Sequence, residues 1–211
     1  MEQWKPETWK SSYIEQFQKL RCFEDVWNIV SPIKKDSKEI SESMSVVVRV
    51  RNLVLPEPGR YTVYDICAGN GLTGIIIAFL LPVKSVIAVD IRRRDRPWEL
   101  ARGFSYQERD LRELTPAFFE KDSIIVGVHA CGILSQKIIE LYNTSRAKHL
   151  ILMPCCNGKI DGMLQFMGDT CGNYAAWSLQ LGLLCKGKVR IKQDKKIISP
   201  KNLVITAHKE R

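Results

Sequence analysis

Two hydrophobic periodicities divide the chain near residue 60. Ahead of that point, apolar side chains recur every three to four residues through 9–20 and again through 23–30. This spacing gathers them on one face of a helix and predicts amphipathic helices. A third helix is expected over about 37–55, after which a Pro-Glu-Pro-Gly sequence breaks the pattern. We therefore predict a helical N-terminal extension over residues 1–60.

From residue 61 onward, short apolar runs alternate with helical segments. The runs predict seven strands, at 61–66, 85–89, 104–107, 123–128, 149–153, 184–191 and 202–207. The segments between them predict helices at about 71–81, 96–102, 114–120, 134–143 and 169–182. Such alternation indicates a parallel sheet covered by helices on both faces. The last two strands lie too close in sequence for a crossover helix, so they should form an antiparallel hairpin. The expected fold for residues 61–211 is α/β, a Rossmann-like, doubly wound, seven-stranded sheet.

Composition narrows the function classes only moderately. The 211 residues are 45% hydrophobic, which suits a folded domain and excludes general disorder. The run from Ile75 to Leu81 is too short to cross a bilayer, so no membrane association is expected. Seven cysteines, an odd number, and the lack of a signal-like start favour reduced thiols in a cytoplasmic protein. The net charge is +9, and residues 151–211, with 10 basic and 4 acidic residues, carry most of it.

A glycine-rich segment follows the first predicted strand, at 65–74 (Asp-Ile-Cys-Ala-Gly-Asn-Gly-Leu-Thr-Gly). From Gly69 it reads G-x-G-x-x-G, and Asp90 follows about 20 residues later, as in dinucleotide sites. However, Asp65 lies between the strand and the glycines, where its carboxylate would repel a pyrophosphate. The same carboxylate suits the sulfonium and ammonium groups of S-adenosylmethionine. Asp110, ending the third strand, could hold an adenine amino group. Acids at three successive strand ends therefore favour the methyl donor over NAD.

At these residues the chain resembles class I S-adenosylmethionine-dependent methyltransferases, whose motif has the form acid-x-Gly-x-Gly-x-Gly. The resemblance covers about 61–207, and Cys67 stands where the first glycine of the motif is expected. It implies that Asp90 contacts the ribose hydroxyls and Asp110 the adenine. His129, which follows the fourth predicted strand, is a further expected contact. The full set of expected cofactor contacts is Asp65, Cys67, Gly69, Gly71, Asp90, Asp110 and His129.

Two short motifs end the fourth and fifth predicted strands. They are His129-Ala-Cys131-Gly and Pro-Cys155-Cys156-Asn-Gly. The pair is similar to a subset of the class that includes the methyltransferase-like domain of glutathione S-transferase C-terminal-domain-containing proteins. More distantly, it resembles tRNA acceptor-stem 2′-O-methyltransferases. The substrates of that subset are diverse, so the resemblance does not fix a reaction.

Several chemistries suit these two motifs, and we name His129, Cys131, Cys155 and Cys156 as catalytic candidates. His129 could act as a general base. A cysteine thiolate could add to a pyrimidine ring, as in RNA 5-methylcytosine enzymes. A zinc site matches the ligand types, but the spacing lacks a C-x₂-C pair and adjacent cysteines chelate poorly, so no metal is assigned. The cysteines could also simply pack beneath the cofactor.

Basic residues alternate along the sixth predicted strand, which would place them on one side of it. They are Lys186, Lys188, Arg190 and Lys192, and a second cluster spans 92–96. Such side chains suit phosphate binding, although lysines on a hairpin also protect a sheet edge. We therefore expect S-adenosylmethionine-dependent methyl transfer with RNA as the favoured substrate. The alternatives are methylation of a protein or small molecule, an NAD-type oxidoreductase, and a noncatalytic donor-binding subunit.

Overall fold

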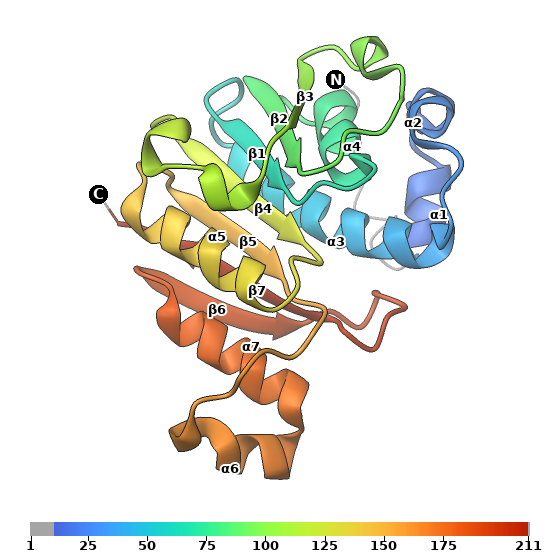
Figure 1. Ribbon diagram of the computed structural model, residues 1–211. Helices are drawn as coiled ribbons and strands as arrows, with labels where there is room; N and C mark the ends of the chain where they lie inside the picture. The colour runs from blue at the N-terminus through green and yellow to red at the C-terminus, as the bar shows by residue number, and fades with distance from the viewer. Residues whose placement is uncertain (1–10, 211) are drawn as a thin grey trace.

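A seven-stranded sheet runs through the middle of the protein (Figure 1). The computed structural model describes residues 11–210, so the first ten residues of the predicted extension lie outside it. The strands are β1 (Thr62–Ile66), β2 (Ser85–Asp90), β3 (Phe104–Glu108), β4 (Ser123–Val128), β5 (His149–Met153), β6 (Lys188–Gln193) and β7 (Leu203–His208). Their order is β3-β2-β1-β4-β5-β7-β6. The first five strands are parallel, and β7 pairs antiparallel with both β5 and β6. The predicted α/β fold with its terminal hairpin is confirmed.

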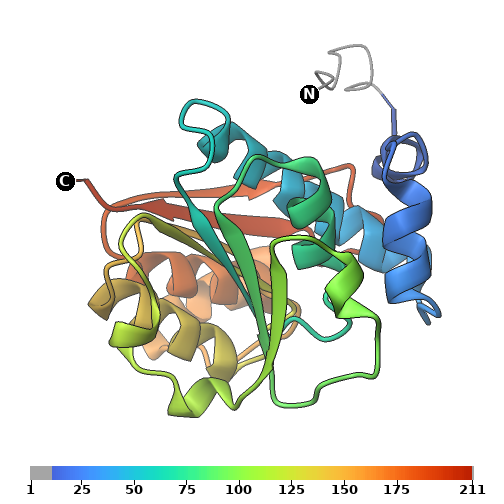
Figure 2. The same cartoon turned by 90° about the horizontal axis from the view of Figure 1, so that it is seen from above.

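Helices cover both faces of this sheet (Figures 1 and 2). They are α1 (Tyr13–Gln18), α2 (Phe23–Val30), α3 (Asp36–Val54), α4 (Leu72–Leu80), α5 (Ile133–Thr144), α6 (Gly162–Cys171) and α7 (Asn173–Leu184). Helices α3 and α4 lie on one face with α1 and α2 beside them, and α5 and α7 lie on the other. Helix α6 packs against α7. Among residues 11–210, no helix combines the length and apolar character needed to span a membrane.

Each face of the sheet has its own hydrophobic core, because successive strand residues point to opposite sides. In β1, Val63 belongs to the core on the α3 side, and Tyr64 belongs to the core on the α5 side. Met44 and Val47 of α3 share the first core with Val63. The N-terminal helices are thus present and packed on the sheet. The domain boundary predicted at residue 60 stays a prediction.

Three of the helix predictions were wrong in detail. The helix expected at 96–102 is a single 3₁₀ turn, η2 (Trp98–Leu100), and the one expected at 114–120 is the turn η4 (Pro116–Phe118), which follows another turn, η3 (Leu111–Glu113). A residue that precedes proline is disfavoured in the helical region, so η2 and η4 do not extend ahead of Pro97 and Pro116. The helix expected at 169–182 is divided at Gly172 into α6 and α7.

The sixth strand begins four residues later than predicted. Helix α7 continues to Leu184, and the chain then turns at Gly187, whose φ is +90°. A Cβ atom at Gly187 would lie 2.2 Å from the carbonyl oxygen of His208. Only glycine fits this turn, so Lys186 lies before the strand rather than on it.

Candidate active site

A cleft of about 360 Å³ opens between the N-terminal turns of α3 and the loop after β1. Its walls come from residues 32–35, from α3, from residues 67–70 and from His129 at the end of β4. Strands β1 and β4 are neighbours, and the chain builds the sheet outward from them in opposite directions. Ligands of open α/β sheets bind at this switch point, outside the carboxyl ends of the strands. The cleft therefore lies where a ligand is expected.

The loop after β1 is held in a left-handed conformation. Cys67, Gly69 and Gly71 have φ values of 59°, 56° and 72°. A Cβ atom at Gly71 would lie 3.0 Å from the ring of Trp98. Glycine tolerates such values freely, whereas a side chain costs about 1–2 kcal/mol. This explains why the family motif has glycine where this chain has Cys67.

The three predicted acids have different environments near this loop. Asp65 is only 1% exposed and its Oδ2 accepts the N–H of Gly74 at 2.9 Å. Burial raises the pKa of Asp65 to about 7. Asp90 accepts the N–H groups of Gly69 at 3.0 Å and Arg92 at 3.1 Å. Of these acids, Asp65 lines the cleft.

Asp110 caps a 3₁₀ turn as well as ending the third strand. Its carboxylate accepts the backbone N–H of Arg112 at 2.8 Å and also pairs with the Arg112 guanidinium, which lowers the pKa of Asp110. Burial is the main cause that raises the pKa of Cys67 to about 12. The charges of Asp90, Asp65 and Asp110 and the Cys131 thiol raise it further. The three acids thus surround Cys67 closely enough to act on it electrostatically.

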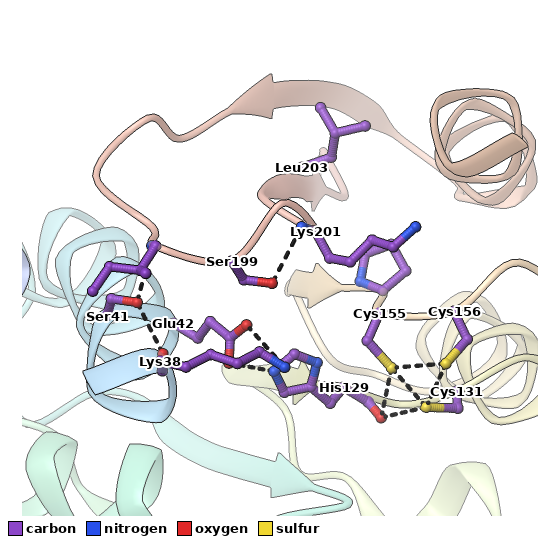
Figure 3. A network of polar contacts seen from close by, with 12 residues as sticks. Lys38, Ser41, Glu42, His129, Cys131, Cys155, Cys156, Ser199, Lys201 and Leu203 are labelled. Carbon is purple, nitrogen blue, oxygen red and sulfur yellow. Dashed lines mark hydrogen bonds and ion pairs between the residues drawn. The ribbon is translucent and has the colours of Figure 1, made fainter. Parts of the chain in front are cut away.

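Glu42 is the site residue that the sequence analysis missed. It lies on α3, is fully buried, and its Oε2 hydrogen-bonds to Nε2 of His129 (Figure 3). A carboxylate only accepts, so this contact places the proton on Nε2 and leaves Nδ1 as an acceptor. The second oxygen, Oε1, has no hydrogen-bond partner and lies 3.8 Å from Nζ of Lys38. His129 itself has a φ of 62°, a strained value at the strand end.

A sequence signal for Glu42 exists in retrospect. Residues 41–45 read Ser-Glu-Ser-Met-Ser, and all five are buried within a helix that is otherwise rich in valine. Ser41 accepts the N–H of Ile198 and Ser45 donates to Asp194, so these two hydroxyls hold α3 against the C-terminal segment. Thr73 donates to Ser43 at 2.9 Å across this contact between α3 and α4. A buried acid among such residues marks a polar site rather than plain core.

The cysteines of the two motifs meet at the carboxyl ends of β4 and β5. These strands pair in parallel, with Val128 opposite Met153. The Sγ atom of Cys131 lies 2.6 Å from that of Cys155 and 3.2 Å from that of Cys156. The Sγ atoms of Cys155 and Cys156 are 3.3 Å apart (Figure 3).

The glycine of the second motif has a packing role. A Cβ atom at Gly158 would lie 2.3 to 2.7 Å from three ring atoms of Trp177, which is buried in the core on the α5 side. The segment after Cys156 therefore lies directly against the Trp177 ring. That contact fixes the course of the chain as it leaves the two cysteines.

Comparison with known families decides the class of this protein. A family model described as a methyltransferase domain matches residues 34–163, which is more than half of the chain. The chain belongs to this methyltransferase family. The match begins ahead of α3 and includes most of the residues that line the cleft, among them His129, and the three clustered cysteines.

Curated relatives of this methyltransferase are much longer than it is. The glutathione S-transferase C-terminal domain-containing protein of Homo sapiens is 30% identical over 158 residues, covering 66% of this chain and 24% of that protein. Its Xenopus laevis counterpart is 28% identical over 138 residues, covering 62% and 21%. The methyltransferase thus spans about a quarter of the length of these relatives.

Solved structures similar to the methyltransferase share its fold at low sequence identity. The CurJ carbon methyltransferase has a TM-score of 0.53 at 16% identity, covering 84% of this chain and 56% of its own. The 23S rRNA methyltransferase ErmE has a TM-score of 0.50 at 12% identity, covering 79% and 68%. The methyltransferase domain of bacterial CtHen1 also scores 0.50, at 14% identity, covering 77% and 97%.

The basic residues of the methyltransferase fall into two separate places. Lys188, Arg190 and Lys192 are exposed, and they line a cavity of about 630 Å³ between α1, α3 and strands β5 to β7. Lys186 does not line it. No residue lines both this cavity and the cleft in the part of the chain that the structure describes. The cleft has a basic rim of its own, formed by Lys34, Lys35, Lys38, Arg94 and Arg96.

Proposed function

We propose that this methyltransferase takes its methyl group from S-adenosylmethionine and transfers it to RNA. The observation that carries the proposal is the separation of charge within the cleft. The acidic floor of the cleft consists of the buried Glu42 and Asp65, whereas Lys34, Lys35 and Arg94 of the basic rim are exposed. A cationic donor suits the floor, and a polyanionic acceptor suits the rim.

The acidic floor fits the donor and does not fit a pyrophosphate. Asp65 and Glu42 are both buried, and Oε1 of Glu42 lacks a hydrogen-bond partner. Lys38 lies 3.8 Å from this oxygen, beyond hydrogen-bond distance, and a bound ammonium group would supply the missing hydrogen bond. The same carboxylates would repel NAD. When bound, S-adenosylmethionine supplies an electrophilic methyl group on a sulfonium.

The remaining cofactor contacts follow from the loop and strand ends. The backbone of Gly69 and Gly71 allows close approach of the donor, and Cys67 lies in the same loop. Asp90 keeps lone pairs for ribose hydroxyls, because a carboxylate offers about four acceptor sites. Asp110 retains part of its accepting capacity for the adenine amino group beside Arg112.

His129 is the group proposed to receive the acceptor's proton. Glu42 fixes the imidazole through Nε2, which leaves Nδ1 to accept. In this arrangement Glu42 is a positioning residue, because it acts through the imidazole. The role rests on the geometry of the pair within the cleft.

The basic rim supports RNA as the acceptor. Lys34, Lys35 and Arg94 are exposed at the mouth of the cleft, where a phosphate backbone could follow them. The fold does not choose the acceptor, since the similar structures include both an rRNA and a carbon methyltransferase. Lys188, Arg190 and Lys192 are proposed as a second contact for a longer RNA.

Calorimetric titration tests the donor. We expect S-adenosylhomocysteine to bind and NAD not to bind. Binding of NAD alone would overturn the proposal. Asp90→Asn should weaken S-adenosylhomocysteine binding, whereas Asp169→Asn, an exposed change on α6, should leave the affinity unchanged.

Transfer of a tritiated methyl group to total RNA, compared with a protein extract, tests the acceptor. We expect label in RNA. Replacing Lys34 and Lys35 together by glutamine should lower RNA labelling while leaving S-adenosylhomocysteine affinity unchanged. It should also reduce the log–log slope of RNA affinity against salt by about 0.7 for each phosphate that is no longer neutralised. Lys121→Gln is the matched control, because Lys121 is exposed and precedes β4, at the end of the strands opposite to the cleft. Label only in protein would end the RNA proposal.

A further inference from the structure

Three thiols converge beside the cleft without any role in the donor site. Cys131 follows β4, and Cys155 and Cys156 follow β5, so two neighbouring strand ends deliver three sulfurs to one point (Figure 3). All three Sγ atoms lie within 4.8 Å of one another. The backbone carbonyl of His129 accepts from Cys131 at 3.3 Å and from Cys155 at 3.6 Å, which holds these sulfurs in place.

Packing does not account for this cluster. Cysteine used as a small apolar residue is among the most buried residue types. Cys131 and Cys156 are exposed, and Cys155 is half-buried. Closely spaced thiols that face solvent are instead the ligands that Zn²⁺ prefers. We propose that Cys131, Cys155 and Cys156 bind one Zn²⁺ ion, with its fourth coordination position open.

The ligand geometry requires only a small adjustment. Zn–S bonds of about 2.3 Å at tetrahedral angles place two sulfurs about 3.8 Å apart. The present separations are 2.6, 3.2 and 3.3 Å, so the sulfurs must spread by about 0.5 to 1.2 Å. Rotation of side chains at the exposed edge of the sheet supplies this movement. The site needs no C-x₂-C pair, because Cys131 comes from the end of the adjacent strand.

The charge balance is also favourable. Binding through three thiolates releases three protons to solvent and leaves a net charge of −1 at the site. Lys38 and Lys201 lie in the same polar network as the three cysteines (Figure 3). These two lysines would offset the negative charge of the complex.

The open position gives the ion a chemical use. The imidazole of His129 is bonded to Glu42, so its Nε2 is not available as a fourth ligand. Zinc with three protein ligands keeps a position for water or substrate and acts there as a Lewis acid. The site would therefore take an oxygen or sulfur atom of the acceptor. This inference goes beyond the proposed function and does not depend on the identity of the donor.

Zinc content and cobalt substitution test the site directly. The untagged chain, loaded with Zn²⁺ and dialysed, should retain about one equivalent. The Co²⁺ derivative should show a thiolate-to-cobalt charge-transfer band. Single serine replacements of Cys131, Cys155 and Cys156 should each abolish or weaken zinc retention. Cys171→Ser on α6 and Cys22→Ser before α2 are matched controls and should retain it.

Two measurements keep the outcome decisive. Circular dichroism and S-adenosylhomocysteine binding report whether each variant is folded. Zinc binding without S-adenosylhomocysteine binding would overturn the proposed function alone. Three results would overturn the zinc site. The wild-type chain fails to retain zinc, Cys131→Ser retains as much zinc as wild type, or the freshly isolated chain contains a Cys131–Cys155 disulfide. A covalent RNA adduct trapped on Cys156 would do the same, since it would assign the thiol to nucleophilic catalysis.

Discussion

Asp65→Asn should stabilise the ligand-free protein at neutral pH while weakening donor binding. Asp65 is buried, and burial raises its pKa from the ordinary 3.8 to about 7. A shift of about three units corresponds to about 4 kcal/mol, at 1.36 kcal/mol per unit. Asparagine is nearly isosteric, and its Oδ1 can still accept the N–H of Gly74. The substitution therefore removes the cost of a buried charge and keeps the hydrogen bond.

The sign of the pH dependence follows from proton binding. Between about pH 4 and pH 7 the unfolded chain has lost the Asp65 proton while the folded protein retains it. The folded state binds more protons there, so the contribution of Asp65 to stability falls as pH rises through this window. The advantage of Asp65→Asn should be small near pH 4 and reach about 4 kcal/mol by pH 8.

Donor binding should show the opposite trend. A ligand ammonium group favours the ionised carboxylate, and S-adenosylhomocysteine keeps that ammonium although it lacks the sulfonium. The affinity of wild-type protein for S-adenosylhomocysteine should therefore rise up to tenfold per pH unit below pH 7 and then level off. Asp65→Asn should bind weakly at every pH. The pH dependence of S-adenosylhomocysteine affinity that Asp65 causes should be absent in this variant.

Urea denaturation of wild-type and variant protein at pH 5 and pH 8 measures the stability difference. Taking the difference between wild type and variant at each pH cancels the contributions of the other titrating groups. Asp169→Asn, an exposed change on α6, should alter stability by no more than about 0.5 kcal/mol at either pH. If Asp65→Asn is less stable than wild type at pH 8, or its advantage does not grow with pH, the reasoning about the buried carboxylate is wrong.

Two further substitutions probe the site. Glu42→Gln keeps a hydrogen bond to His129 but removes the charge, so kcat should fall about tenfold. Steady-state kinetics that separate kcat from KM measure this fall. An unchanged kcat would contradict the positioning role of Glu42. Gly158→Ala forces a methyl group against Trp177 and should cost about 1–3 kcal/mol in urea denaturation, whereas a change below about 0.5 kcal/mol would contradict the packing argument.

Most of the sheet could be predicted because its signals are local. Continuous apolar runs such as 123–128 and 149–153 are long enough to identify buried strands, and both were placed correctly. The glycine loop and the two cysteine motifs were recognisable for the same reason, since each is a contiguous sequence ending a strand. Strand order then follows from the family resemblance. The residues of β1, β4 and β5 thus reach one edge of the sheet.

Contacts between distant segments could not be predicted. Glu42 enters the site only because α3 folds over the glycine loop, and nothing near it in sequence identifies His129 as its partner. Lys186 was wrongly placed on a strand because the close approach of β7 at Gly187 is a tertiary effect. The acidic floor and basic rim likewise combine residues from three separate segments. The distribution of net charge predicted phosphate binding at the C-terminal segment, whereas the basic rim of the cleft comes from residues 34–38 and 94–96.

Cys67 offers a last test of the loop, because its φ of 59° reverses the usual ranking of alanine and glycine. At an ordinary position glycine is less stable than alanine by about 0.4–1 kcal/mol, since it loses more freedom on folding. In the left-handed region a Cβ atom costs about 1–2 kcal/mol. Cys67→Gly should therefore be more stable than Cys67→Ala by about 1 kcal/mol in urea denaturation. Both variants lack the thiol, so the difference isolates the backbone. If the alanine variant is the more stable one, the loop relaxes away from this conformation when no ligand is bound.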